Sequence, residues 1–147
     1  MDWDLVLAGA HHLAVFALVG IFAAEFALLR PGLGGVRLTQ LSRLDAAYGA
    51  VATIVILVGI VRVIFGGVGW QYYVGNQAFW GKMAAFAIMG ALTVPPTLAI
   101  RRWLKGGVDA PVAAGEIASA RRFIHLQAGV LVLIPLFAAA MARGYGS

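Results

Sequence analysis

Two adjacent histidines and a glutamate lie inside the first long apolar stretch of the chain, from Leu5 to Leu29. Imidazole nitrogens can ligate haem iron or other metals, and a carboxylate can pair with a cation or carry a proton. About 25 residues, each rising about 1.5 Å, reach roughly 37 Å and can cross a bilayer core of about 30 Å. Ionisable groups are expensive at such depth and normally face a bundle interior, a partner or a ligand. His11, His12 and Glu25 are therefore the first candidates for a functional site.

The composition limits the chemistry that these residues can perform. The 147 residues are 62% hydrophobic and only 12% charged, which is typical of a membrane protein and not of a soluble one. The chain has no cysteine, which excludes disulfides, Fe–S ligation, thiolate metal sites and covalently attached haem c. Redox chemistry would therefore need a non-covalent cofactor. The basic residues cluster in two loops, and we find no signal for nucleic-acid binding.

Four apolar stretches predict an all-α fold, a four-transmembrane-helix bundle that forms one integral membrane domain over residues 1–147. The predicted spans are residues 5–29, 46–65, 79–100 and 123–142. Acidic residues precede the first span and it is long, so we expect it to be retained and not cleaved as a signal peptide. Basic residues around 30–45 predict a loop, and Pro95 and Pro96 predict a kink or loosening in the third span.

The basic residues also predict an orientation. The first and third connectors, with the adjoining span ends, carry Arg30, Arg37, Arg43, Arg101, Arg102, Lys105, Arg121 and Arg122, whereas the other side carries Arg62, Lys82 and Arg143. By the positive-inside tendency both termini lie on the outer, periplasmic side of a bacterial inner membrane, which the chain crosses several times.

This topology places one polar group in the outer half of the membrane: His11, His12, Arg62 and Lys82. An imidazole can be an axial haem ligand, and the two cations can contact propionates or an anionic substrate. Met89 shares a helix face with Lys82 and is a further candidate ligand. The alternative is structural, with the histidines bonded to neighbouring helices and the cations reaching the headgroups. Zinc or copper is less favoured because no carboxylate or third imidazole lies in this half.

A second polar group falls in the inner half: Glu25, Asp45, Tyr48 and His125. His125 in this group and His12 in the outer group are too far apart to bind the same metal ion or the same haem. A Glu25–His125 pair could relay protons. Alternatively, Glu25 pairs with Arg43 or Arg121 and only holds the bundle together.

The layout resembles that of HemJ-type protoporphyrinogen oxidases and of a related group of uncharacterised small four-helix bacterial membrane proteins. The resemblance rests on the four short spans, on His12 within the segment Ala10 to Val15, on Trp80-Gly81-Lys82 opening the third span, and on the arginines before the fourth. It implies a haem b bundle that oxidises protoporphyrinogen IX, with His12 as the axial ligand of the metal and Lys82 as the second functional residue.

The chain also departs from the pattern of that family. The fourth span reads His125-Leu126-Gln127-Ala128 where the family has Asn-Glu-x-Pro, and Arg30 and Pro95-Pro96 stand where the family has further histidines. These departures affect the expected porphyrinogen oxidase activity more than the expected haem binding.

The resulting hypothesis is a haem b protein with His12 as a ligand and His11 or Met89 as second ligands. Arg62 and Lys82 contact the propionates or substrate, and Lys82, Glu25 and His125 serve catalysis or proton movement. Electrons would come from a porphyrin-like or quinol donor. We expect the chain to form a homo-oligomer or to be a subunit of a larger membrane complex. Two alternatives stay open: a cofactor-free accessory or assembly subunit of such a complex, and a small transporter or proton channel that depends on Glu25.

Overall fold

The computed structural model describes residues 2–66 and 69–145, and every regular element within them is an α-helix. The helices are α1 (Trp3–Leu28), α2 (Gly35–Phe65), α3 (Trp70–Val74), α4 (Gln77–Lys105) and α5 (Ala114–Ala142). Four of them, α1, α2, α4 and α5, are long and apolar enough to cross a membrane. This confirms the predicted all-α fold with four membrane-spanning helices.

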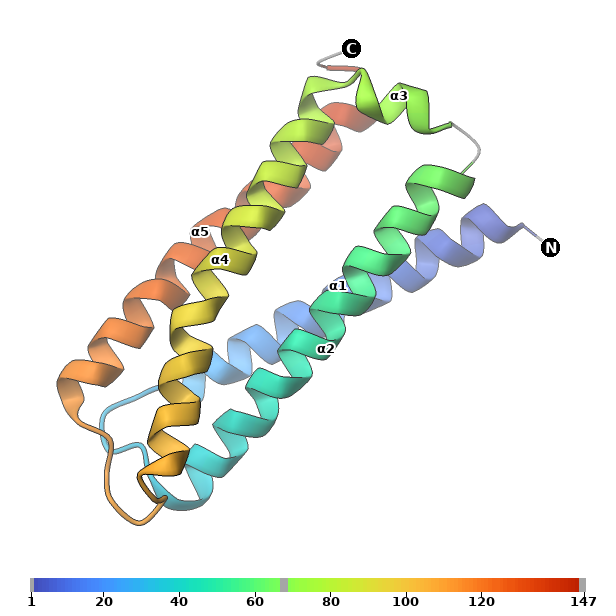
Figure 1. Ribbon diagram of the computed structural model, residues 1–147. Coiled ribbons are helices and arrows are strands. Elements are labelled where there is room, and N and C mark those ends of the chain that lie inside the picture. Colours follow the sequence, from blue (N-terminus) through green and yellow to red (C-terminus); the bar gives the residue numbers. More distant parts are fainter. Residues whose placement is uncertain (1, 67–68, 146–147) are drawn as a thin grey trace.

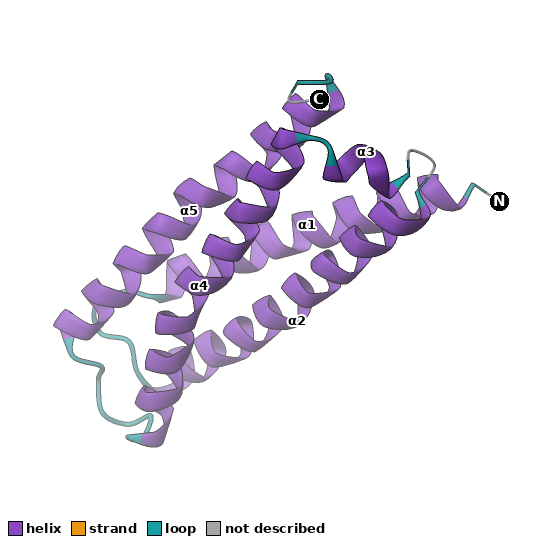
Figure 2. Cartoon of the chain, turned by 45° about the horizontal axis from the view of Figure 1, so that its top comes forward, coloured by secondary structure: helices purple, strands orange, loops and turns teal. Residues whose placement is uncertain are grey.

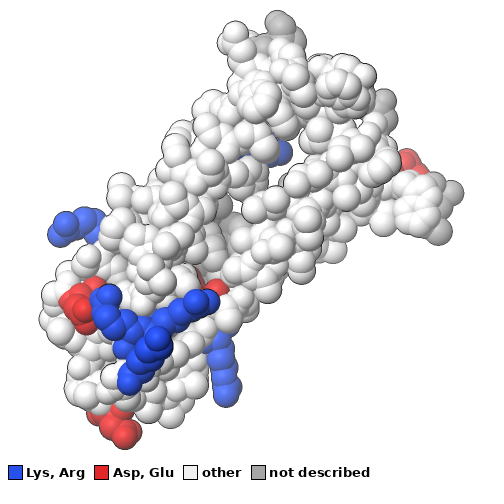
Figure 3. Space-filling view, in the orientation of Figure 1, with Lys and Arg blue, Asp and Glu red and all other residues white. Residues whose placement is uncertain are grey.

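The four long helices form two antiparallel hairpins, α1 with α2 and α4 with α5. Figures 1 and 2 show that the hairpins converge where the connections at residues 29–34 and 106–113 lie, and separate toward the end that carries α3. Lys and Arg side chains gather at the converging end (Figure 3). We call this the basic end, defined by the two connections and the adjoining helix turns, and the opposite end the α3 end.

Helices α2 and α5 begin well before the predicted spans, which start at residues 46 and 123, and the predicted loop around residues 37–45 is helical. Helix α2 starts at Gly35 and α5 at Ala114, because apolar residues continue at helical spacing through these polar segments. Their side chains pack in one core at the basic end and are 0–1% exposed: Leu38, Leu41 and Ile117. Burial of this stripe therefore extends both helices beyond the apolar stretches.

The two prolines lie within α4, which continues to Lys105. Pro96 has no N–H, so the carbonyl of Leu92 loses the helical donor that would bond to it. The Nε2 of Gln127 on α5 donates to that carbonyl at 3.1 Å, and the Gln127 side chain is buried. A side chain from the neighbouring helix thus compensates for the hydrogen bond that the proline removes.

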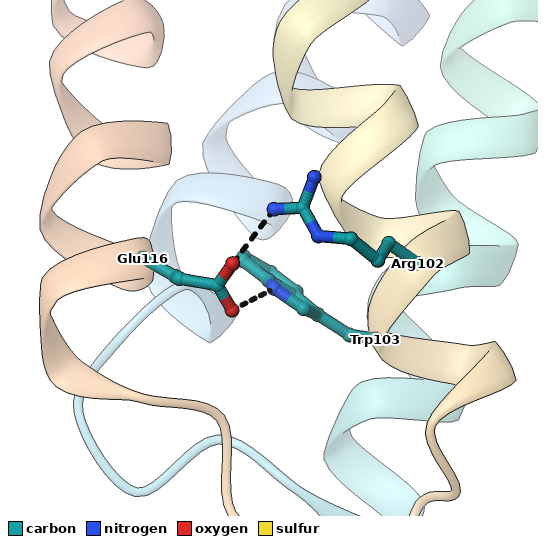
Figure 4. Close-up of polar contacts among 3 residues, drawn as sticks. All are labelled: Arg102, Trp103 and Glu116. Atoms are coloured by element: carbon teal, nitrogen blue, oxygen red, sulfur yellow. Dashed lines mark hydrogen bonds and ion pairs between the residues drawn. The ribbon is translucent and has the colours of Figure 1, made fainter.

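Glu116 closes the α4–α5 hairpin at the basic end (Figure 4). Its Oε1 accepts from Nη2 of Arg102 at 2.8 Å, and its Oε2 accepts from Nε1 of Trp103 at 2.9 Å. The Trp103 ring is buried, whereas the Arg102 side chain is 63% exposed. The indole contact should therefore contribute more to stability than the ion pair.

Replacing Glu116 with Ala leaves the buried indole N–H of Trp103 without its acceptor, and we expect the free energy of unfolding to fall by about 1–3 kcal/mol. Arg102→Ala removes only an exposed ion pair and should cost less than about 1 kcal/mol. Thermal unfolding in detergent, followed by circular dichroism, compares the two variants. Equal losses would contradict this ranking.

Candidate functional site

Three helices bring His11, Arg62 and Lys82 together toward the α3 end, and we call these three residues the outer cluster. The His11 side chain faces α2, where its Cε1 lies 3.8 Å from the position that a Cβ on Gly59 would take. Arg62 and Lys82 both lie within electrostatic range of His11, and Lys82 lies within range of Arg62. Of the four residues that the sequence placed in one polar group, these three on α1, α2 and α4 thus lie within electrostatic range of one another.

The polar atoms of the outer cluster have few partners. Nδ1 of His11 and Nε of Arg62 are buried without a hydrogen-bond partner among the described atoms. Nζ of Lys82 lies 6.0 Å from the centre of the Phe86 ring, a distant cation–π contact. Among the described residues, 2–66 and 69–145, the one ion pair joins Arg102 to Glu116 at the basic end, far from this cluster. The two cations therefore have no described anion beside them.

His12 borders this cluster without facing into it, since its ring centre lies 6.2 Å from that of His11, whereas Met89 lies apart from the cluster. The His12 ring is exposed on the outside of α1, with its Nδ1 at 2.7 Å from the carbonyl oxygen of Ala8. Met89 is 5% exposed and packs in the core with Phe22 and Tyr48. His11, and not His12, is thus the imidazole that faces the other helices, and the geometry does not favour His12 or Met89 as ligands to a group held by the cluster.

Aromatic side chains link α3 to the ends of the neighbouring helices. The hydroxyl of Tyr72 donates to the carbonyl of Met141 at 3.0 Å, and Nε1 of Trp80 donates to the carbonyl of Val74 at 2.9 Å. The ring of Tyr73 lies 5.6 Å from that of Tyr72. These contacts fix α3 across the ends of α4 and α5, beside the helix turn that carries Lys82.

A pair of carboxyl groups lies deeper in the bundle, toward the basic end. Glu25 on α1 and Asp45 on α2 are within hydrogen-bond range of each other, and we call them the carboxyl pair. Glu25 is 4% exposed, and its Oε1 has no hydrogen-bond partner among the described atoms. The hydroxyl of Thr97 on α4 donates to Oδ1 of Asp45 at 3.0 Å. The pair therefore connects the two hairpins.

A chain of neutral polar groups continues from the carboxyl pair toward α5. The buried Tyr48 has Thr93, Glu25 and Asp45 as its polar neighbours. Thr93 donates to the carbonyl of Met89 at 2.9 Å and contacts Oε1 of Gln127 at 3.3 Å. Sequence reasoning did not assign Thr93 or Thr97 to a site, since threonines in membrane helices are common. The sequence signal for Gln127 was Pro96, because a proline leaves the carbonyl of the residue four positions earlier, Leu92, without its helical hydrogen-bond donor.

His125 does not form the predicted relay with Glu25. The His125 side chain is exposed, and its ring lies 5.2 Å from the Phe26 ring. The alternative ion pair of Glu25 with Arg121 is not formed either, because Nη1 of Arg121 donates to the carbonyl of Leu29 at 2.6 Å and its guanidinium stacks over Phe26 at 4.5 Å. Arg121 thus caps the end of α1, where carbonyls lack helical donors.

Within the described part of the chain, no group of three or more His, Cys, Asp or Glu side chains is placed to hold a metal ion. A family described as a predicted membrane protein (DUF2214) matches residues 3–146, which is nearly the whole sequence. The chain belongs to this family. No curated protein and no solved structure matches it. The match agrees with the predicted membrane protein, and the likeness of this DUF2214 chain to HemJ-type enzymes stays a prediction.

Gly81 sets the close approach of α4 and α5 beside Lys82. A Cβ at this position would lie 2.7 Å from the Phe137 ring, which is closer than such atoms can pack. Gly81→Ala should displace Phe137 and lower the free energy of unfolding by about 1–3 kcal/mol.

Gly90→Ala is the matched control for Gly81→Ala, because a Cβ at Gly90 meets nothing within 4 Å. It should leave stability unchanged or raise it by up to about 1 kcal/mol through helix propensity. Thermal unfolding in detergent measures both variants, and equal stability of the two would show that the α4–α5 contact tolerates a methyl group at Gly81.

Proposed function

We propose that the protein binds an anionic ligand between its two hairpins near the α3 end, and that His11, Arg62 and Lys82 hold it. The observation that carries this proposal is the outer cluster itself, in which two cations and an imidazole lie together without a described anion. Unpaired charge inside a membrane is expensive, so such groups normally have a partner or a ligand. Asp4 lies beside Gly66 at the end of α2, but no ion pair joins it to Arg62.

The shape of the molecule supports this position for a ligand. Figure 3 shows an opening between the hairpins on the α3 side, with Lys or Arg atoms inside it. Simple snorkelling would place the charged atoms in the headgroup region, whereas Nε of Arg62 and Nδ1 of His11 are buried. A suitable ligand would have an anionic edge that pairs with the two cations and an apolar body that packs against the surrounding apolar helices.

Haem b is the ligand of this class that we propose. Its two propionates would pair with Lys82 and Arg62, and His11 takes the place of His12 as the imidazole that would face the iron. The partnerless Nδ1 and Nε atoms fit such a group. Bound haem would supply electron transfer, and the HemJ-type resemblance adds an oxidoreductase activity on a porphyrinogen or quinol to this proposal. The residues of the chain would bind the haem and orient its propionate edge toward the α3 end.

The test is a haem titration of the detergent-purified protein, with absorption spectra of the oxidised and dithionite-reduced forms. We expect a Soret band with reduced α and β bands in the wild type and in His12→Ala, and loss of these bands in His11→Ala. Lys82→Gln and Arg62→Gln should each weaken binding by about 10–100-fold, the effect of one charge-assisted hydrogen bond.

Three results of the titration would overturn parts of the proposal. A folded wild type that stays colourless with haem supplied would exclude haem and favour a cofactor-free subunit of a larger complex. Loss of colour in His12→Ala but not in His11→Ala would reverse the assignment of the ligand. Unchanged affinity in both cation variants would exclude the outer cluster as the binding site.

The orientation belongs to the same proposal, since both termini and the α3 end would face the periplasm of a bacterial cell. The chain has no cysteine, so single-cysteine variants report accessibility without background. We expect a membrane-impermeant maleimide to label Asp2→Cys in cells whose inner membrane is intact, and to label Asp109→Cys only after that membrane is permeabilised. The reverse pattern would place the outer cluster on the cytoplasmic side.

A further inference from the structure

We propose that the carboxyl pair, Glu25 with Asp45, is a proton-binding site, and that its proton holds the two hairpins together at the level of Thr97. This site is separate from the outer cluster and does not depend on any ligand bound there. It also differs from the relay through His125, whose ring lies against Phe26.

The burial of the pair is the first step of the argument. Glu25 is 4% exposed and Asp45 is half-buried, and both lie within hydrophobic helices. Two ionised carboxylates in hydrogen-bond range repel each other strongly where water is scarce. A single shared proton removes one charge and supplies the donor that a carboxyl–carboxyl hydrogen bond needs. The geometry of the pair is therefore that of a site with one proton bound.

The groups that face the pair supply one positive charge at most. Asp45 lies within electrostatic range of Arg101 on α4, whose side chain is exposed, and Tyr48 on α2 is neutral. On α5, Arg121 is bonded to carbonyls of α1, and His125 is exposed. One cation balances one carboxylate, so the second carboxyl group is left to take the proton.

The binding of a metal cation is less well supported by the same atoms. Calcium takes six to eight oxygen ligands, and magnesium needs an octahedral shell. Here Oε1 of Glu25 has no polar partner among the described atoms, and Oδ1 of Asp45 already accepts from Thr97. An incomplete shell of this kind suits a proton, which needs only one donor and one acceptor.

The carboxyl pair lies at the junction of the two hairpins, so its proton would affect how the hairpins are held together. Glu25 and Asp45 belong to the α1–α2 hairpin, and Thr97, which donates to Asp45, belongs to the α4–α5 hairpin. The Tyr48–Thr93 contact lies one turn away and joins the same two hairpins. Loss of the proton would leave two carboxylates that repel each other beside these contacts. We therefore expect deprotonation to weaken the junction of the hairpins and to widen the opening toward the α3 end.

Infrared spectroscopy of the full chain in nanodiscs, without haem, tests the site directly. The wild type should show the C=O band of a protonated carboxyl group at neutral pH, and raising the pH should remove the band. The Glu25→Gln/Asp45→Asn double variant keeps the size of the pair and should lack the band, whereas the exposed control variant Asp109→Asn should keep it. Absence of the band in the wild type, or its persistence in the double variant, would overturn the proposal. So would loss of the band on adding NaCl at constant pH, which would identify sodium as the ligand.

Spin labels test the effect on the hairpins. Labels at Ile60→Cys on α2 and Ile88→Cys on α4 occupy exposed positions on the two hairpins. We expect the distance between the labels to grow over the pH range in which the infrared band disappears, and to stay constant in the double variant. A constant distance in the otherwise wild-type chain would overturn the coupling. Neither experiment depends on the outer cluster, so failure of haem binding leaves this test intact.

Discussion

The scarcity of water inside a membrane is the constraint on which this structure depends, because each polar group must find its partner within the protein. Toward the basic end the chain meets this constraint mainly through contacts between helices, and Oε1 of Glu25 is the buried side-chain atom without a partner among the described residues there. Arg121 donates to the carbonyl of Leu29, Gln127 to that of Leu92, and Thr97 to Asp45. The backbone N–H of Val112 also donates to the carbonyl of Leu33 at 2.9 Å, which joins the two connections. These bonds hold the hairpins together where the largest part of the core is buried.

The α3 end meets the same constraint only in part. Its aromatic contacts tie α3 to α4 and α5, yet polar atoms of His11 and Arg62 are buried without partners. The hairpins also separate in this direction (Figure 1). One end of the bundle is thus closed by hydrogen bonds, and the other combines an opening with unpaired positive charge. A closed end that positions the helices and an open end that offers charge is an arrangement suited to binding a ligand from one side of the membrane.

The two polar centres carry opposite charge, and each would be neutralised by a different species. The outer cluster concentrates positive charge, which an anionic ligand would balance, and the carboxyl pair concentrates negative charge, which a proton would balance. Both centres lie where the hairpins face each other, so a change in the junction at Thr97 would also change the opening near Lys82. This relation gives a membrane protein of this small size a physical route by which proton binding and ligand binding could influence each other.

The sequence alone determined the helical class, the four spans and the presence of ionisable groups at two depths, because hydropathy, length and the spacing of polar residues are local properties. It also placed His11, His12, Arg62 and Lys82 at one depth, and residues at the same membrane depth can meet when the helices pack. The tertiary structure decided which of two adjacent histidines faces inward, because His11 and His12 point about 100° apart and only packing fixes the rotation of α1. It likewise decided that Glu25 meets Asp45 and not His125 or an arginine. Such pairings depend on how four helices rotate against one another, and the packing of buried side chains such as Leu38 and Ile117 sets that rotation.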